Sequence, residues 1–282
     1  MSGTLQLPSP TWFAGCGNMG GAILDGWRSG GLDLGAVTVI RPSGTEVAGA
    51  RVVTSFAQAG PPPKLVVLAF KPQKLDDVVP ELRRVLSAGT AVVSLLAGVE
   101  TGSLRQRFPG VRAIVRAIPN LPVAVRRGVT GLYSADADQQ TRTELNNLFS
   151  ALGFAMWTVD EAKLSAIGSV AGAGPAYVAR FVAALTKAGV KQGLTDEIAA
   201  TIARETVLGT AWMAATTSED MASIARRVAS PRGTTEAGLA ILDREHVLDE
   251  LVAVTIDAAA RRGAELAVEA KTPSLEEPAR LP

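Results

Sequence analysis

The sequence contains very little of the side-chain chemistry that most nucleophilic enzymes and metal sites use. Its 282 residues include one cysteine, Cys16, and one histidine, His246. A disulfide framework within the chain is therefore excluded, which is typical of proteins from a reducing compartment. A lone histidine gives no support to Ser-His-Asp hydrolysis. We also expect no metal site.

An excess of charge of one sign and long uncharged apolar runs are absent as well. The net charge is +1 at pH 7, so no overall field attracts nucleic acid or an anionic membrane. The most apolar long stretch, residues 166–190, contains Arg180 and Lys187, which argues against a membrane span. The first residues lack a basic stretch followed by an apolar run, so we expect no signal peptide. These absences predict a cytoplasmic protein that binds neither nucleic acid nor membrane.

What the sequence does contain is a regular alternation of segments over its first 160 residues. Short apolar runs predict strands at 11–15, 36–40, 51–55, 64–70, 90–96, 111–118, 128–133 and 154–159. Helical spacing of apolar residues predicts helices at 18–28, 75–86, 101–108 and 139–152. Alternating strands and helices predict a doubly wound α/β domain over residues 1–160.

The pattern changes at Glu161, after which no further strand-like run with turn signals occurs. The segments 163–193, 195–216, 218–228, 235–243 and 246–270 all predict helices. We therefore expect an all-α domain over residues 161–270, and its broad apolar coverage predicts burial against another subunit. The last segment, 271–282, contains three prolines and no hydrophobic period, which predicts a disordered tail.

A glycine-rich turn follows the first predicted strand. The segment Gly15-Cys16-Gly17-Asn18-Met19-Gly20 matches G-x-G-x-x-G between a strand and a helix, as in Rossmann-like dinucleotide-binding domains. Gly15 would make the tight turn, Gly17 would let a pyrophosphate approach the backbone, and Gly20 would let helix and strand pack closely. We interpret Cys16 as a small space-filling residue. This segment predicts a dinucleotide site.

The second predicted strand ends at a basic residue. NAD-binding proteins usually place an acidic residue at the end of this strand, whereas this sequence has Arg41, followed by Ser43. A cation and a hydroxyl suit the 2′-phosphate of NADP. The alternative is that Arg41 is simply a solvated arginine after a strand.

Motifs along most of the chain resemble those of the pyrroline-5-carboxylate reductase family. "FAGCGNMGGAI" resembles the family's dinucleotide loop, "LAFKPQ" its motif beside the nicotinamide, and "SLLAGV" and "VRAIPNLPVAVRRGVTGL" its next two signatures. "GAGPAYVARFVAAL" and "VASPRGTTEAGLAIL" resemble the signatures of its helical domain. The order and spacing match from residue 11 to residue 269, so the series is far more specific than any single motif.

The resemblance implies an oxidoreductase that makes L-proline. Hydride would pass from C4 of NAD(P)H to the C=N carbon of 1-pyrroline-5-carboxylate, the last step of proline biosynthesis. NADPH is the expected cofactor, with NADH as the alternative. The helical domain would dimerise with its copy in a second chain, and further assembly of the dimers is left open. The implied cofactor-binding residues are Gly15, Gly17, Asn18, Met19, Gly20, Arg41, Ser43, Ala69, Lys71, Pro72, Ala97 and Gly98.

A second candidate anion site lies more than two hundred residues later in the chain. Residues 228–238, "VASPRGTTEAG", form a turn cluster that opens a helix, and a helix N-terminus binds anions. The resemblance makes this segment the substrate loop, whose amides would bind the substrate carboxylate. Thr235 is the implied catalytic residue, with its hydroxyl facing the imine nitrogen. The implied substrate-binding residues are Asn120, Ser230, Gly233, Thr234 and Thr235.

Several positions depart from the family's pattern. Ser165 and Gly168 stand where the family usually has an acidic residue and a threonine, Ala171 and Ala173 replace two serines, and Arg232 replaces a glycine. These departures leave two alternatives open: a reductase of another cyclic imine, such as a six-membered one, or a catalytically weakened dinucleotide-binding paralogue. The side chain of Arg232 either lies in solvent at the edge of the turn or adds a charge to the carboxylate site.

Overall fold

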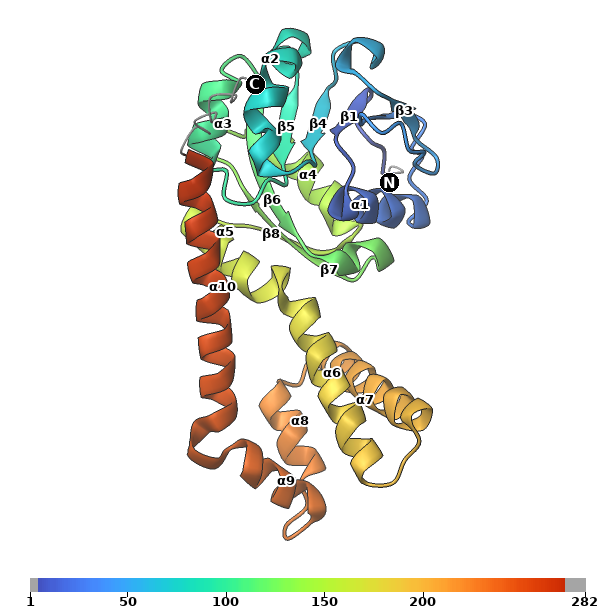
Figure 1. The fold of residues 1–282 in the computed structure, drawn as a ribbon, viewed down its shortest axis with the longest axis vertical. Helices are drawn as coiled ribbons and strands as arrows, with labels where there is room; N and C mark the ends of the chain where they lie inside the picture. Colours follow the sequence, from blue (N-terminus) through green and yellow to red (C-terminus); the bar gives the residue numbers. More distant parts are fainter. Residues whose placement is uncertain (1–4, 272–282) are drawn as a thin grey trace, which may run out of the picture. The chain divides into compact units, whose positions relative to one another are not determined.

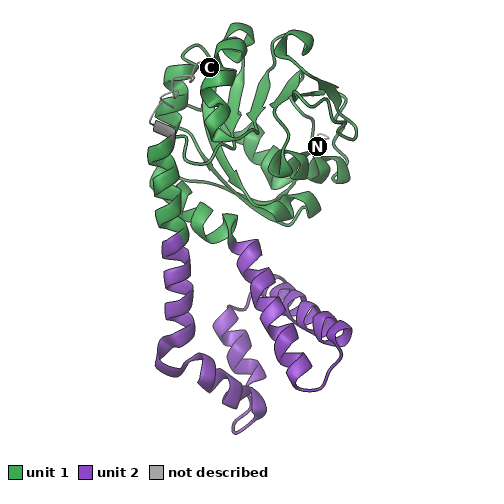
Figure 2. Ribbon diagram, viewed as in Figure 1, with its two compact units in different colours: residues 1–173, 259–282 green, residues 174–258 purple. Residues whose placement is uncertain are grey.

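A computed structural model describes residues 5–271 of the chain, which form two compact units (Figure 2). One unit contains the described residues up to Ala173 together with the part of the last helix from Ala259 on, and the other contains residues 174–258. The domain boundary that we predict near residue 160 marks the end of the last strand, while the compact units divide after Ala173. The predicted disordered tail lies outside the described residues from Thr272 on.

The first unit is built on a sheet of eight strands in the order β3-β2-β1-β4-β5-β6-β7-β8 (Figure 1). Neighbouring strands are parallel except β6 and β7. Only a short 3-10 helix, Leu121–Val125, joins these two strands, and a parallel pair would need a longer crossover connection. The predicted α/β class is confirmed, with one antiparallel step in the sheet. The strands are β1 (Thr11–Ala14), β2 (Val37–Ile40), β3 (Arg51–Val53), β4 (Leu65–Leu68), β5 (Ala91–Ser94), β6 (Ala113–Pro119), β7 (Gly128–Tyr133) and β8 (Gly153–Trp157).

Helices cover both faces of this sheet and create two apolar cores. Helices α1 (Asn18–Ser29) and α4 (Gln139–Ser150) pack on one face, where the fully buried Trp27 donates its ring N–H to the carbonyl of Leu148 at 2.8 Å. Helices α2 (Leu75–Val85) and α3 (Thr101–Arg107) pack on the other face through Leu82 and Leu104. Two covered faces explain why the strands are continuous apolar runs.

The chain is helical from Glu161 on, but the single helix predicted over 163–193 is wrong. Helix α5 (Glu161–Ile167) passes into a π-helical turn, Gly168–Gly172, and the helix restarts as α6 (Gly174–Lys191). A side chain at Gly168 would come within 3.3 Å of Ile118 on β6, so this turn approaches the sheet closely. The remaining helices are α7 (Asp196–Thr217), α8 (Met221–Val228), α9 (Thr234–Leu242) and α10 (Val247–Lys271). Across residues 5–271, no helix combines the length and apolar character needed to cross a bilayer.

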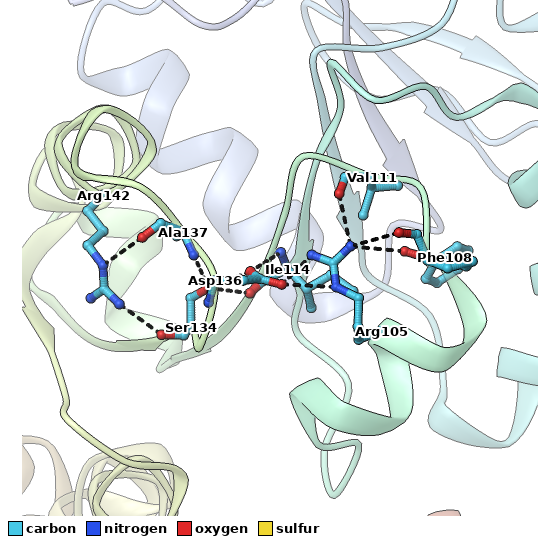
Figure 3. A network of polar contacts seen from close by, with 9 residues as sticks. Arg105, Phe108, Val111, Ile114, Ser134, Asp136, Ala137 and Arg142 are labelled. Carbon is cyan, nitrogen blue, oxygen red and sulfur yellow. Dashed lines mark hydrogen bonds and ion pairs between the residues drawn. The ribbon is translucent and has the colours of Figure 1, made fainter.

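A polar network ties loops together at the amino end of β6 (Figure 3). The Asp136 carboxylate accepts hydrogen bonds from the backbone N–H of Ile114 and the hydroxyl of Ser134, both at 3.0 Å, and pairs with the guanidinium of Arg105. Arg142 donates to the Ser134 carbonyl at 2.8 Å. The guanidinium of Arg105, besides its pair with Asp136, donates to the carbonyls of Phe108, Pro109 and Val111. This edge of the sheet lies opposite the loops that follow β1, β4 and β5.

Replacing Asp136 with asparagine is expected to destabilise the fold by about 2 kcal/mol, because hydrogen bonds to a charged group contribute about 1.5–3 kcal/mol each. The side chains of Arg105 and Asp136 are 32% and 36% exposed, so solvent screening keeps the loss near the lower value. The shift in the midpoint of urea unfolding measures it. Asp77→Asn is the control, since Asp77 pairs with Lys74 on the surface and should change stability by less than about 0.5 kcal/mol. Equal shifts of the unfolding midpoint for the two variants would contradict the stabilising role of Asp136.

Candidate active site

The loops that carry most of the predicted cofactor residues meet at one edge of the sheet. In the parallel register Ala14 lies beside Leu68, and Leu68 lies beside Ser94. The carboxyl ends of β1, β4 and β5 are therefore level, and a dinucleotide binds at this edge of a doubly wound sheet. The structure brings together the loops that contain Gly15, Gly17, Ala69, Lys71, Pro72, Ala97 and Gly98.

The turn after β1 has the geometry that a pyrophosphate needs. Gly15 has φ +79°, and a Cβ there would lie 2.9 Å from the carbonyl oxygen of Ala69, so only glycine fits. Gly17 is the N-cap residue of helix α1 and gives it no side-chain cap, and nothing lies within 4 Å of the position of its missing Cβ. The amides of Asn18 and Met19 have no acceptor among the described residues. Free amides and an open approach fit an anion at the helix N-terminus.

A cavity of about 630 Å³ extends from this turn along helix α1. Arg41, which directly follows β2, lines the cavity, and its side chain makes no ion pair within the described part of the chain. The predicted cofactor residue Ser43 is not among the lining residues, and its hydroxyl is hydrogen-bonded to that of Thr45 at 2.9 Å. The lining residues are Cys16, Gly17, Asn18, Gly21, Ala22, Asp25, Arg41, Glu46, Val47, Ala48 and Ala124.

Two acidic residues of this cavity were missed by the sequence analysis. Asp25 lies two turns after Asn18 on the same face of α1, so helical spacing predicts its position once the phosphate loop is located. Asp25 also pairs with Arg28 at 3.2 Å. Glu46 follows Arg41 in an irregular segment, where no period indicates which side chains face the cavity.

The environment of Cys16 disfavours the thiolate form of its side chain. Burial raises the pKa of the Cys16 thiol, Asp25 raises it further, and the nearby guanidinium of Arg41 only partly opposes these effects. The thiolate is the reactive form, so a raised pKa is consistent with a space-filling role. Across residues 5–271, no three His, Cys, Asp or Glu side chains lie close enough together to hold a metal ion.

The predicted cofactor residues in the loops after β4 and β5 differ in exposure and in packing. Lys71 is exposed at the start of a 3-10 turn, Pro72–Lys74, and Ala97 is exposed after β5. Gly98 has φ +75°, and a Cβ there would lie 2.7 Å from the backbone carbonyl of Leu266 in α10. Gly98 therefore has a packing role in addition to any contact with a cofactor.

Asn120, a predicted substrate residue, is buried and hydrogen-bonded within the protein. Its side-chain carbonyl accepts from the N–H of Val129 at 2.8 Å, and its amide donates to the carbonyl of Ala171 at 3.0 Å. It thereby joins the end of β6 to the π-helical turn. A contact between Asn120 and a substrate stays a prediction.

The second predicted anion site lies at the start of helix α9, in the unit of residues 174–258. Gly233 is the N-cap residue of this helix, gives it no side-chain cap, and donates its N–H to the carbonyl of Ser230 at 2.9 Å. Thr234 is exposed and Thr235 is half-buried, and their amides have no acceptor among the described residues. Glu236 reaches back to accept from the N–H of Arg232 at 2.7 Å. This geometry suits a small carboxylate.

The backbone of Arg232 adopts a left-handed conformation, with φ +58°. This conformation costs a residue with a Cβ about 1–2 kcal/mol, whereas glycine adopts it freely. The family's usual glycine is thus the residue that the turn favours, a feature that the sequence pattern alone does not reveal. The Arg232 side chain is exposed within its unit.

Replacing Arg232 with glycine is expected to stabilise the protein by about 0.5–1 kcal/mol. Relief of the left-handed strain gains about 1–2 kcal/mol, and the greater freedom of glycine in the unfolded chain cancels about 0.4–1 kcal/mol of this. The matched control is Arg226→Gly in the last turn of helix α8, which should lower stability by about 1 kcal/mol. The two variants should shift the midpoint of urea unfolding in opposite directions. A loss of stability in Arg232→Gly would contradict the strain argument.

Two family models match the chain. The model described as pyrroline-5-carboxylate reductase dimerisation matches residues 161–266. The model described as NADP oxidoreductase, coenzyme F420-dependent, matches residues 12–98, which contain the glycine-rich turn and the cavity-lining Arg41.

Individual relatives extend this similarity over most of the chain. A pyrroline-5-carboxylate reductase of Pseudomonas aeruginosa is 36% identical over 262 residues, which cover 90% of this chain and 96% of the relative. The structure of a pyrroline-5-carboxylate reductase from Coxiella burnetii superposes with a TM-score of 0.84 at 32% identity, covering 93% of this chain and 99% of that one. A Plasmodium falciparum pyrroline carboxylate reductase, solved with NADP bound, shares the fold with a TM-score of 0.83 at 22% identity and covers 94% of this chain and 100% of its own.

Proposed function

This chain belongs to the pyrroline-5-carboxylate reductase family, and we propose that it reduces 1-pyrroline-5-carboxylate to L-proline with NADPH. One structural observation supports this function above the others. Among the described helices, α1 and α9 follow the glycines Gly17 and Gly233, have no side-chain cap, and leave amides of their first turn without an acceptor. Two such sites could bind the phosphates of a dinucleotide and the carboxylate of a substrate.

The cofactor is a nicotinamide dinucleotide, and we infer that NADPH is preferred over NADH. Support for the preference comes from Arg41, whose guanidinium lines the cavity beside the phosphate loop and has no acidic partner in the described part of the chain. Charge-assisted hydrogen bonds from arginine to phosphate are short and strong. Glu46 in the same cavity acts against the preference, so we expect NADH to be used as well, at lower affinity.

Few residues of the protein are needed for the chemistry. When bound, NADPH supplies the hydride that adds to the carbon of the protonated C=N bond, which turns the imine into a secondary amine. The amides of Thr234 and Thr235 bind the substrate carboxylate at the positive end of helix α9. The Thr235 hydroxyl faces the imine nitrogen and accepts the hydrogen bond of its protonated form.

Self-association follows from the dimerisation region, and we propose that the assembly is an obligate homodimer. Large apolar side chains on the described helices α6, α7 and α10 are about half exposed in the single chain, among them Phe181, Ile202, Trp212 and Leu251. Patches of this kind rarely face water. The proposal would be contradicted if the protein had the mass of a monomer in light scattering at micromolar concentration and was still active as a reductase. A cytoplasmic location, in the reducing compartment that the single cysteine favours, stays a prediction.

The assay that tests the function measures the oxidation of NADPH by absorbance, at a fixed pH near neutrality, with each of several imines as the substrate. We expect 1-pyrroline-5-carboxylate to be the best substrate by kcat/KM. A six-membered imine carboxylate tests the effect of Ala171 and Ala173, where the family usually has serines. Faster reduction of the six-membered imine would replace the proposed substrate, and binding of NADPH without turnover of any imine would favour a weakened paralogue.

A further inference from the structure

The loop after β5, residues 95–100, is contacted at its carboxyl end and near its middle by the segments that begin and end the helical region of the chain. At one end, Glu161 of helix α5 reaches Thr101, the first residue of α3. Near the middle, Leu266 of α10 packs on Gly98. All four residues belong to the first compact unit.

Glu161 joins three elements through one carboxylate. One oxygen accepts from the N–H of Thr101 at 3.0 Å and from the guanidinium of Arg116 on β6 at 2.9 Å, and the other accepts from the Thr101 hydroxyl at 3.2 Å. The first amides of a helix lack acceptors within the helix, so this carboxylate caps α3 from a distance. The Arg116 side chain is 7% exposed, and this burial fixes the position of the pair.

The contact at Gly98 leaves the loop no room on its other side. A Cβ at this position would lie 2.7 Å from both the carbonyl carbon and the carbonyl oxygen of Leu266. The backbone of α10 therefore lies directly against the loop. A displacement of Thr101 cannot be absorbed by movement of Gly98 toward α10, because close-packed groups transmit displacement.

We propose that Glu161 is a positioning residue for hydride transfer: through Thr101 it fixes the loop that contains the predicted cofactor residues Ala97 and Gly98 at the edge of the sheet where the dinucleotide would bind. The inference rests on the proposed function, since the loop follows β5 at the edge where β1 presents the phosphate turn. Ion pairs contribute little net stability at the surface and in the interior, so the value of this half-buried one lies in the geometry that it imposes. Hydride transfer is sensitive to such geometry, because a displacement of about 1 Å lowers a rate by about 100-fold.

Three variants separate positioning from general stability. Glu161→Gln keeps the shape of the side chain and removes its charge. Thr101→Val removes one hydroxyl and leaves the Arg116–Glu161 pair intact, so it folds even where Glu161→Gln does not. Glu144→Gln is the matched control, because Glu144 pairs at 3.3 Å with Arg112, the residue just before the first residue of β6.

The readouts are the single-turnover rate of NADPH oxidation at saturating imine, the Kd for NADPH by fluorescence, and the KM for the imine. We expect Glu161→Gln to lower the rate about tenfold and raise the Kd about fivefold, and Thr101→Val to lower the rate about threefold, with the KM for the imine within twofold. Deuterium at C4 of NADPH should slow Glu161→Gln by a larger factor than wild type, which a purely structural role would not cause.

Two results would overturn the inference. In the first, the single-turnover rate and the Kd for NADPH of Glu161→Gln lie within twofold of those of Glu144→Gln, whether or not the two variants differ in thermal stability. The other is an unchanged rate in a well-folded Thr101→Val. If wild type binds NADPH and reduces no imine, the proposed function fails instead, and the Kd comparison alone decides whether Glu161 positions the loop: a Kd raised about fivefold supports it and an unchanged Kd overturns it.

Discussion

Replacing Thr235 with alanine is expected to lower kcat for imine reduction by about 10- to 100-fold and to leave NADPH binding nearly intact. A hydrogen bond to a charged group contributes about 1.5–3 kcal/mol, and each 1.4 kcal/mol corresponds to a factor of ten. Alanine keeps the backbone amide at the start of α9, so the proposed hydrogen bonds to the substrate carboxylate remain. The KM for the imine should therefore change less than kcat.

Thr235→Ser is the control for this variant, because serine restores the hydroxyl and removes only a methyl group. We expect serine to recover most of the rate. Steady-state kinetics with 1-pyrroline-5-carboxylate and a separate titration with NADPH give the two quantities. If Thr235→Ala leaves both kcat and KM unchanged, the loop over residues 230–235 is not the active site, and the proposed mechanism fails.

Replacing Arg41 with aspartate is expected to reverse the order of the two cofactors. Loss of a charge-assisted hydrogen bond to the 2′-phosphate costs about 1.5–3 kcal/mol, or about one to two decades in affinity. The new carboxylate also repels that phosphate, and Glu46 lines the same cavity and adds to the repulsion. The KM for NADPH should rise at least tenfold, while the KM for NADH should change little or fall.

The control is Arg84→Asp, which makes the same charge change on the exposed side of helix α2, away from the cavity. It should leave the ratio of kcat/KM for the two cofactors unchanged. A wild-type enzyme that prefers NADH, or an Arg41→Asp variant that keeps the wild-type ratio, would show that Arg41 does not read the 2′-phosphate.

The parts of the fold that sequence reasoning predicted depend on local patterns. The apolar run at β4 and the glycine turn before Asn18 each carry a complete local signal, namely composition in one case and spacing in the other. The π-helical turn at Gly168–Gly172 has no such signal. It depends on how closely Gly168 approaches Ile118, a contact fifty residues distant in sequence that no local pattern encodes.

The candidate site divides in the same way. Asp25 was predictable from helical spacing after Asn18, because the cavity lies along one face of α1. The left-handed backbone of Arg232 was not, since it depends on a turn whose Glu236 accepts from the Arg232 N–H. The role inferred for Glu161 depends on a side chain that reaches an amide sixty positions earlier. Long-range hydrogen bonds of this kind follow only from the folded arrangement.

Helix α10 begins in one compact unit at Val247 and ends in the other, which makes the first unit discontinuous in the chain. The last part of α10 packs on Gly98. A ribosome must therefore synthesise nearly the whole chain before the loop after β5 can make its contact with Leu266. The first compact unit therefore cannot complete its packing until the residues of the other unit have been synthesised. For the same reason, a fragment that stops at Ala173 lacks Leu266 and leaves this side of Gly98 without its packing partner.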